Sequence, residues 1–148
     1  MKKKIIAIVL TVMTAAAALG VSVLADDTIK VLINGEQITF TDVEPYIEHG
    51  RTLVPMRKIF ESLGANVEWD ADTRTIVSYD PVSDVSIVMQ IDSNIMFVNE
   101  TPIELDVPAV IVDSRTIVPV RAVAEGMNSV VNWDGATRTV TIEKEMNR

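Results

Sequence analysis

The 148-residue sequence contains no cysteine and only one histidine, His49. Disulfide bonds and thiolate metal sites are therefore excluded, and one imidazole is too few for a copper site of the multi-histidine kind. No nucleophile-elbow pattern is present to supply a serine for a catalytic triad with His49. His49 precedes Gly50 in a polar stretch, which is typical of a solvated loop. We predict no catalytic residue, no cofactor and no metal.

Glycine and long apolar runs are also scarce. The six glycines stand singly, so no glycine-rich phosphate-binding loop is present. The one long apolar run, Ile5 to Leu24, follows Lys2–Lys4 and is followed by Ala25 and Asp26. This pattern is typical of a secretory signal peptide, residues 1–25, and predicts a secreted, cell-envelope-associated protein. Retention of this segment as a single membrane anchor is the alternative.

Positive charge is in short supply beyond the predicted cleavage site. Residues 26–148 contain all 21 acidic residues but only 10 of the 13 Lys and Arg, which gives a net charge of −11. This charge repels polyanions, so we expect no nucleic-acid partner, and no stable membrane insertion after signal cleavage. The remaining length suffices for one core without disulfides. We predict a single domain, residues 26–148, that is a monomer or a weak homo-oligomer.

What the sequence does contain is an internal repeat with a spacing of 64 residues. RTLVPMR at Arg51–Arg57 returns as RTIVPVR at Arg115–Arg121, and TRT at Thr73–Thr75 returns at Thr137–Thr139. Such self-similarity indicates a duplication, with repeats at about 29–79 and 95–143 joined by a strand at 85–91. The motif residues are Arg51, Pro55, Arg57, Trp69, Asp70 and Arg74, with counterparts Arg115, Pro119, Arg121, Trp133, Asp134 and Arg138.

Each repeat has the pattern of hairpins around one short helix. Apolar residues alternate around Asn34-Gly35, a strong hairpin signal, and again in 95–105. Pro55 and Pro119 suit the first helical position. Gly64 and Asn128 suit the left-handed residue after a helix, and further hairpins follow. The helices are indicated by apolar positions Met56, Ile59, Phe60 and Leu63, repeated at Val120, Val123, Ala124 and Met127. We predict an α+β domain, an antiparallel β-sheet with hairpins packed on two short helices, built from two related β-β-α-β-β-type repeats.

Arg57 and Arg121 fall in the first turn of the predicted helices, where a cation opposes the helix dipole. Each should therefore have a carboxylate or carbonyl partner. Asp70 and Asp134 are the candidates, and the resulting ion pairs would join each helix to its hairpin. The alternative is that the two arginines capture an anionic ligand.

The carboxylates after each Trp have several possible roles. We interpret Asp70, Asp72 and Asp134 as turn residues that accept backbone hydrogen bonds. A calcium loop, or an acid and base for glycoside cleavage, are the alternatives. Trp69 and Trp133 are interpreted first as core or sheet-face aromatics and second as platforms for sugar stacking.

The order of hairpin with Asn-Gly, proline loop, RTLVPMR, helix with Leu-Gly-Ala, VEWD and TRT resembles the copper amine oxidase N-terminal-like domain, or stalk domain, of exported Gram-positive proteins. The resemblance covers about residues 29–143. The second copy has Gly126-Met127-Asn128 where the pattern prefers Leu-Gly-Ala, so its helix is expected to be shorter or less regular. The resemblance implies a noncatalytic accessory module that binds cell-wall glycan or an extracellular protein. A secreted protein-binding or inhibitor module and a small carboxylate-dependent hydrolase are the alternatives.

Overall fold

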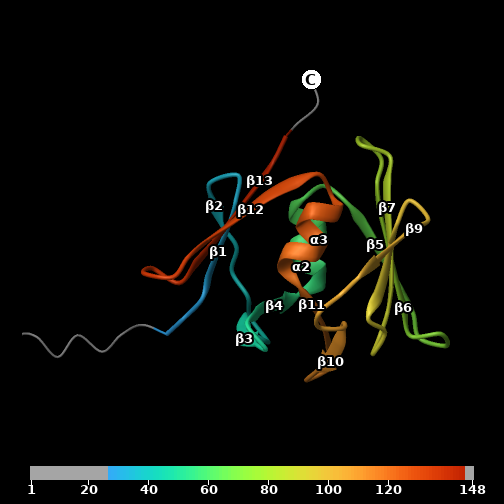
Figure 1. Cartoon of the computed structure of the whole chain (residues 1–148), viewed down its shortest axis with the longest axis horizontal. Helices are drawn as coiled ribbons and strands as arrows, with labels where there is room; N and C mark the ends of the chain where they lie inside the picture. The colour runs from blue at the N-terminus through green and yellow to red at the C-terminus, as the bar shows by residue number, and fades with distance from the viewer. Residues whose placement is uncertain (1–26, 146–148) are drawn as a thin grey trace, which may run out of the picture.

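A computed structural model describes residues 27–145, so the predicted signal peptide at 1–25 lies outside the described residues. Within this part, three sheets surround two helices (Figure 1), and no helix is long and apolar enough to cross a membrane. Sheet A has the order β12-β13-β1-β2, sheet B β10-β11-β4-β3 and sheet C β5-β6-β7-β8-β9. The strands are β1 (Lys30–Ile33), β2 (Glu36–Gln37), β3 (Tyr46–Glu48), β4 (Arg51–Pro55), β5 (Asn66–Asp70), β6 (Thr75–Asp80), β7 (Val85–Gln90), β8 (Ile95–Val98), β9 (Thr101–Glu104), β10 (Val110–Val112), β11 (Arg115–Pro119), β12 (Ser129–Asp134) and β13 (Thr139–Lys144).

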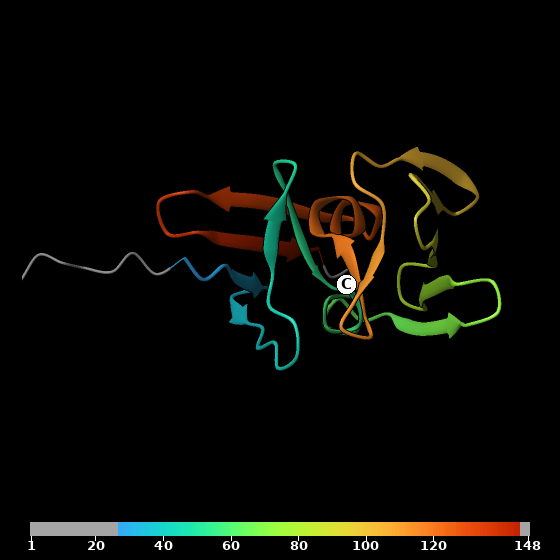
Figure 2. The same cartoon turned by 90° about the horizontal axis from the view of Figure 1, so that it is seen from below.

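The helices α2 (Met56–Ser62) and α3 (Val120–Gly126) lie between sheets A and C, with sheet B against their N-terminal ends (Figures 1 and 2). The α+β prediction is confirmed. All eight apolar positions of the predicted helix faces are buried, because residues three and four apart lie on the same face of a helix. They join strand residues from sheets A and C in one apolar core, which contains the fully buried Phe60, Ile76 and Ile142.

Both helices end in a left-handed residue, as predicted. Gly64 has φ +91° and Asn128 has φ +57°. After α2, Gly64 N–H donates to Glu61 O at 3.0 Å and Ala65 N–H donates to Phe60 O at 2.9 Å, which is a Schellman motif.

Of the expectation that α3 is shorter or less regular, the shorter length is wrong, since α2 and α3 have seven residues each. Gly126 instead serves close packing against sheet C. A Cβ atom there would lie 3.1 Å from Ile87 Cδ1 and 3.2 Å from Val98 Cγ2. The missing side chain lets α3 approach β7 and β8.

The expectation of one antiparallel sheet is only partly correct, because the strands form three sheets and one strand pair is parallel. In sheet C, β7 lies between β6 and β8, and all neighbours are antiparallel. Sheet A has no strand between β13 and β1, so these two pair directly and run parallel, with Lys30 opposite Thr139 and Ile33 opposite Ile142. In sheet C, β6 and β8 run in the same direction, as β13 and β1 do in sheet A. Strand β7 lies between them and is antiparallel to both, so sheet C contains no parallel pair.

Sheet B was missed by the sequence reasoning, which treated the RT(L/I)VP segments as an approach to the helix. They form β4 and β11, which pair with each other so that Val54 lies opposite Val118, its counterpart 64 residues away. Pro55 and Pro119 are therefore strand residues immediately before the helices, and their expected place at the first helical position is corrected. Proline fits this last strand position because its fixed φ, about −65°, is also the φ of the helix that follows.

Every sheet combines strands from the two halves of the chain. Sheet A combines β1 and β2 with β12 and β13, and sheet C combines β5–β7 with β8 and β9. Sheet B joins β3 and β4 to β10 and β11. Each half therefore completes its sheets only with strands of the other half.

A buried ion pair connects the ends of sheets A and C. Asp80 in β6 and Lys144 in β13 are 64 residues apart in the sequence and contact each other, with side chains 1% and 12% exposed. Lys144 Nζ also donates to Leu63 O at the end of α2, at 2.6 Å. Asp80 Oδ1 accepts from Val82 N–H at 2.9 Å, and its Oδ2 accepts from Ser83 Oγ at 2.5 Å. Burial acts to raise the pKa of Asp80, but the hydrogen bonds from Lys144, Ser83 and Val82 outweigh it and lower the pKa from 3.8 to about 2.

This carboxylate makes the stability of the domain depend on acid pH. A pKa that is lower in the folded state contributes stability above pH 4, and this contribution is lost as the pH falls towards 2. The difference between 3.8 and about 2 corresponds to about 2 kcal/mol in the free energy of unfolding. Urea denaturation from pH 6 to pH 2 should therefore show the wild type losing about 2 kcal/mol more than the Asp80→Asn variant. An equal decrease in the free energy of unfolding of the wild type and of the Asp80→Asn variant would contradict this prediction.

Candidate functional site

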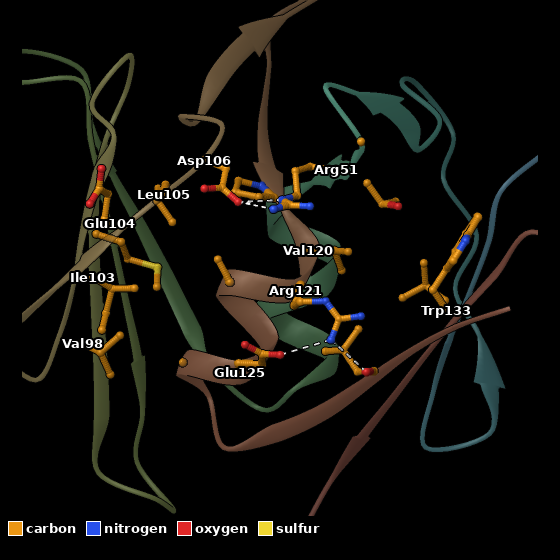
Figure 3. A pocket seen from close by; sticks show the side chains of 18 of the residues that line it. Arg51, Val98, Ile103, Glu104, Leu105, Asp106, Val120, Arg121, Glu125 and Trp133 are labelled. Atoms are coloured by element: carbon orange, nitrogen blue, oxygen red, sulfur yellow. Dashed lines mark hydrogen bonds and ion pairs between the residues drawn. The ribbon is translucent and has the colours of Figure 1, made fainter. Parts of the chain in front are cut away.

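Two of the clefts on the surface each include one of the two tryptophans in their lining. The Trp133 cleft, of about 820 Å³, is lined by parts of sheet C, α3 and sheet A (Figure 3). The Trp69 cleft, of about 510 Å³, is lined by α2, β5 and the start of β11. Their polar residues correspond at a spacing of 64: Arg51, Asp106, Arg121 and Glu125 in the Trp133 cleft, and Arg115, Asp42, Arg57 and Glu61 in the Trp69 cleft.

One ion pair in each cleft joins the two halves of the chain. Arg51 at the start of β4 donates from Nε to Asp106 Oδ2 at 2.8 Å, and its Nη2 donates to the same oxygen. Arg115 at the start of β11 contacts Asp42 Oδ2 in the same way, also at 2.8 Å from Nε. All four side chains are more than half exposed. Within residues 27–145 the Oδ1 atoms of both aspartates accept no hydrogen bond, so each can accept one from a ligand.

A second ion pair in each cleft lies on a helix. Arg121 Nη1 donates to Glu125 Oε1 at 3.2 Å and to Val131 O at 3.1 Å (Figure 3). Arg57 Nη1 lies 3.5 Å from Glu61 Oε1. Both arginines therefore have the carboxylate or carbonyl partner that was predicted. The proposed partners Asp70 and Asp134 are wrong, because a glutamate one helical turn away lies on the same face and is easier to reach.

Asp70 and Asp134 accept backbone hydrogen bonds in turns, as interpreted from the sequence, whereas the side chain of Asp72 makes no hydrogen bond within residues 27–145. Asp70 Oδ1 accepts from the N–H groups of Asp72 at 2.9 Å and Thr73 at 3.2 Å. Asp134 Oδ1 accepts from Ala136 at 2.9 Å and Thr137 at 3.3 Å. The hydrogen bonds from Thr73 are the main cause that lowers the pKa of Asp70. The two aspartates belong to β5 in sheet C and β12 in sheet A, so they do not converge as glycoside cleavage by this pair requires.

Trp69 and Trp133 are sheet-face residues and not core residues. Their exposed fractions are 37% and 40%. Figure 3 shows Trp133 on one side of its cleft, Glu104 and Ile103 on the other side, and Arg121 and Glu125 between them. Each cleft thus presents one partly exposed indole beside paired charges.

Of the other motif residues, Pro119 lines the Trp133 cleft and Pro55 the Trp69 cleft, whereas Arg74 and Arg138 line neither. Arg74 and Arg138 have positive φ values of 54° and 50° in the turns after the tryptophans. Arg74 Nη1 lies 3.8 Å from Asp92 Oδ2, and Arg138 Nε donates to Asp27 O at 3.0 Å. His49 is exposed in the turn between β3 and β4, in agreement with its interpretation as a loop residue.

The arrangement suits noncovalent binding of a polar molecule with an apolar face. An indole attracts polarised C–H groups to its electron-rich face, and a sugar ring presents such groups on one side and hydroxyls around its edge. The guanidinium groups donate hydrogen bonds to hydroxyl oxygens, and the exposed carboxylates accept them. Within the described part of the chain, no three His, Cys, Asp or Glu side chains are grouped so that they could hold a metal ion.

Sequence reasoning found the tryptophans and Arg57 and Arg121, but it missed Asp42, Asp106 and the role of Arg51 and Arg115. A signal was present, since Asp42 and Asp106 are themselves 64 residues apart. Their pairing with an arginine of the other half depends on sheet B, which was not predicted.

Comparison with known families gives one match: the family described as Copper amine oxidase N-terminal domain matches residues 32–142. Comparison with curated proteins gives no match. The matched range contains both tryptophans, all four ion pairs of the clefts and most of the three sheets.

Proposed function

This chain belongs to the copper amine oxidase N-terminal domain family, and we propose that it is an exported, noncatalytic module that binds cell-wall glycan in its two clefts. The N-terminal domain of copper amine oxidases is a noncatalytic domain. A binding role is therefore consistent with the family. Export is supported by the signal-peptide pattern of residues 1–25.

The residues of this chain do not fit a copper site. Copper in proteins prefers imidazole or sulfur ligands, and this sequence has one histidine and no cysteine. His49 lies exposed in the turn between β3 and β4, and neither cleft includes it. We therefore assign no step to copper.

The observation that carries the proposal is the presence of a partly exposed tryptophan beside two ion pairs in both clefts. A purely apolar partner would bury the Oδ1 atoms of Asp42 and Asp106 and the unused N–H groups of the arginines without hydrogen-bond partners, at a cost in binding free energy. A polyanion would be repelled by the net charge of −11 on residues 26–148. A glycan that is not a polyanion has hydroxyl and amide groups for the ion pairs and C–H faces for the indoles, so it fits both requirements.

Replacing both tryptophans by alanine should abolish binding to isolated cell walls. A central aromatic contact contributes on the order of 2 kcal/mol, so each single variant, Trp69→Ala or Trp133→Ala, should bind about thirtyfold more weakly. Purified residues 26–148 would be cosedimented with Gram-positive walls, with and without EDTA and with walls stripped of anionic polymers. Stripping should leave binding intact or strengthen it, and EDTA should have no effect if glycan is the target.

The matched control is Phe97→Ala, which removes another aromatic side chain that is 42% exposed but lies outside both clefts. This variant should cosediment like the wild type. A folded Trp69→Ala/Trp133→Ala double variant that still cosediments like the wild type would refute the role of the clefts.

A second candidate function is binding of an extracellular protein on the outer face of sheet C. Val77, Val88, Phe97 and Pro102 lie side by side across four strands there. The corresponding row of sheet A is more polar and consists of Thr141, Leu32 and Gln37, so the fold itself does not require an apolar row. The acidic residues Glu68, Asp84 and Glu100 of the same sheet favour a partner with a basic border around an apolar patch. Loss of wall binding in Phe97→Ala, with normal binding in the tryptophan variants, would favour this candidate.

A further inference from the structure

The two clefts differ in their unpaired charge, and from this difference we infer that they have different ligands: the Trp69 cleft takes an acidic sugar unit and the Trp133 cleft a neutral one. This inference rests on the proposed glycan binding and adds a specificity to each cleft. Its determinants are Lys58 in one cleft and Glu104 in the other.

Four of the five charged side chains in each cleft neutralise one another in pairs. The Trp133 cleft holds the pairs Arg51–Asp106 and Arg121–Glu125 and, in addition, Glu104. The Trp69 cleft holds the pairs Arg115–Asp42 and Arg57–Glu61 and, in addition, Lys58. The fifth charge therefore decides the sign in each cleft. Two cations and three anions line the Trp133 cleft, and three cations and two anions line the Trp69 cleft.

Lys58 and Glu104 are available to a ligand. Both are exposed, and neither makes a hydrogen bond or ion pair within residues 27–145. The residue 64 positions after Lys58 is Ala122, which also lines its cleft. The pairing of Val98 with Thr101 matches that of Ile33 with Glu36, so Glu104 corresponds to Thr39, which does not line the Trp69 cleft. Each cleft thus has one charged side chain whose counterpart in the other half carries no charge.

The negative net charge of the domain makes the unpaired charge in each cleft decisive for the binding of an acidic sugar. On a domain with a net charge of −11, an acidic sugar has no general electrostatic attraction and needs a local cation. Lys58 can donate a charge-assisted hydrogen bond to a sugar carboxylate, whereas the paired arginines are already engaged. Glu104 would repel the same carboxylate in the Trp133 cleft, but it can accept hydrogen bonds from the hydroxyls of a neutral sugar.

The test uses residues 26–148 with one cleft disabled at a time. Trp133→Ala leaves the Trp69 cleft, and Trp69→Ala leaves the Trp133 cleft. Two probes are titrated by calorimetry at low and high salt: a neutral tetramer of N-acetylglucosamine and an acidic tetramer of galacturonic acid. With Trp133→Ala the acidic probe should bind about fivefold more tightly than the neutral one at low salt, and salt should reduce this preference. With Trp69→Ala the neutral probe should bind more tightly.

Exchange of the determinants provides the matched control. Adding Lys58→Glu to Trp133→Ala should reverse the preference of the Trp69 cleft. Adding Ala122→Lys and Glu104→Thr to Trp69→Ala should give the Trp133 cleft a preference for the acidic probe. Both probes binding with the same relative affinity in all four variants would overturn the inference and leave the proposed function standing. Failure of the wild type to bind either probe would overturn both.

Discussion

Replacing Asp80 by alanine should lower the free energy of unfolding by about 3–5 kcal/mol, because it leaves the buried ammonium group of Lys144 without its counter-charge. The side chains of this pair are only 1% and 12% exposed. The substitution also removes the acceptor for Val82 N–H and Ser83 Oγ in the turn between β6 and β7. Guanidinium denaturation at pH 7, followed by circular dichroism, measures the change.

Two further variants separate the buried pair from carboxylates in general. Asp72→Ala removes an exposed carboxylate whose side chain makes no hydrogen bond within residues 27–145, so it should change stability by less than about 0.5 kcal/mol. The double variant Asp80→Leu/Lys144→Met removes both charges and should recover much of the loss, since an apolar pair leaves no buried ion unpaired. A loss below 1 kcal/mol in Asp80→Ala would show that the pair is not buried in solution.

Neither half of the chain should fold alone. Residues 27–91 contain β1–β7 and α2, and residues 92–145 contain β8–β13 and α3, so every sheet is divided between the two pieces. Each piece would expose its part of the shared core and lack partners for β4 or β11 in the centre of sheet B. The free energy of unfolding of a domain of this size is only about 5–15 kcal/mol. The loss of half the core and of these strand pairs exceeds it, so neither piece should be stably folded.

Thermal denaturation should therefore show a cooperative transition for residues 27–145 and none for either piece. An equimolar mixture should regain part of the transition and the dispersion of amide signals in NMR spectra, since the two pieces together supply all the strands. A cooperative, concentration-independent transition in one isolated piece would contradict the shared architecture.

Local features of the fold could be predicted from the sequence because their causes are local. The helix spacing from Met56 to Leu63 placed the correct face in the core, and Gly64 and Asn128 took the predicted left-handed backbone. The turns at Asp70 and Asp134 depend on hydrogen bonds to residues two and three positions away. Such contacts form whatever the rest of the chain does.

Features that depend on distant strands could not be predicted in the same way. Whether RTLVP is a strand depends on its pairing with RTIVP, which adds sheet B. The cleft pairs Arg51–Asp106 and Arg115–Asp42, and the buried pair Asp80–Lys144, join residues 55, 73 and 64 positions apart. The need of Arg57 for a partner was predicted correctly, but the partner is Glu61 on the same helix face and not the predicted Asp70.

The parallel pairing of β1 with β13 has a mechanical consequence. The chain enters the described fold before Lys30 and leaves it after Lys144, at opposite ends of this strand pair. Tension between the two ends pulls β1 and β13 along their lengths in opposite directions. It loads their hydrogen bonds together, including those from Lys30 N–H to Arg138 O at 3.0 Å and from Asn34 N–H to Ile142 O at 2.9 Å. Strands sheared in this way must break several bonds at once, whereas an unzipped hairpin breaks them one after another. Resistance to force is governed by the rate of unfolding, so this geometry makes the domain suited to bear load between two attachment points.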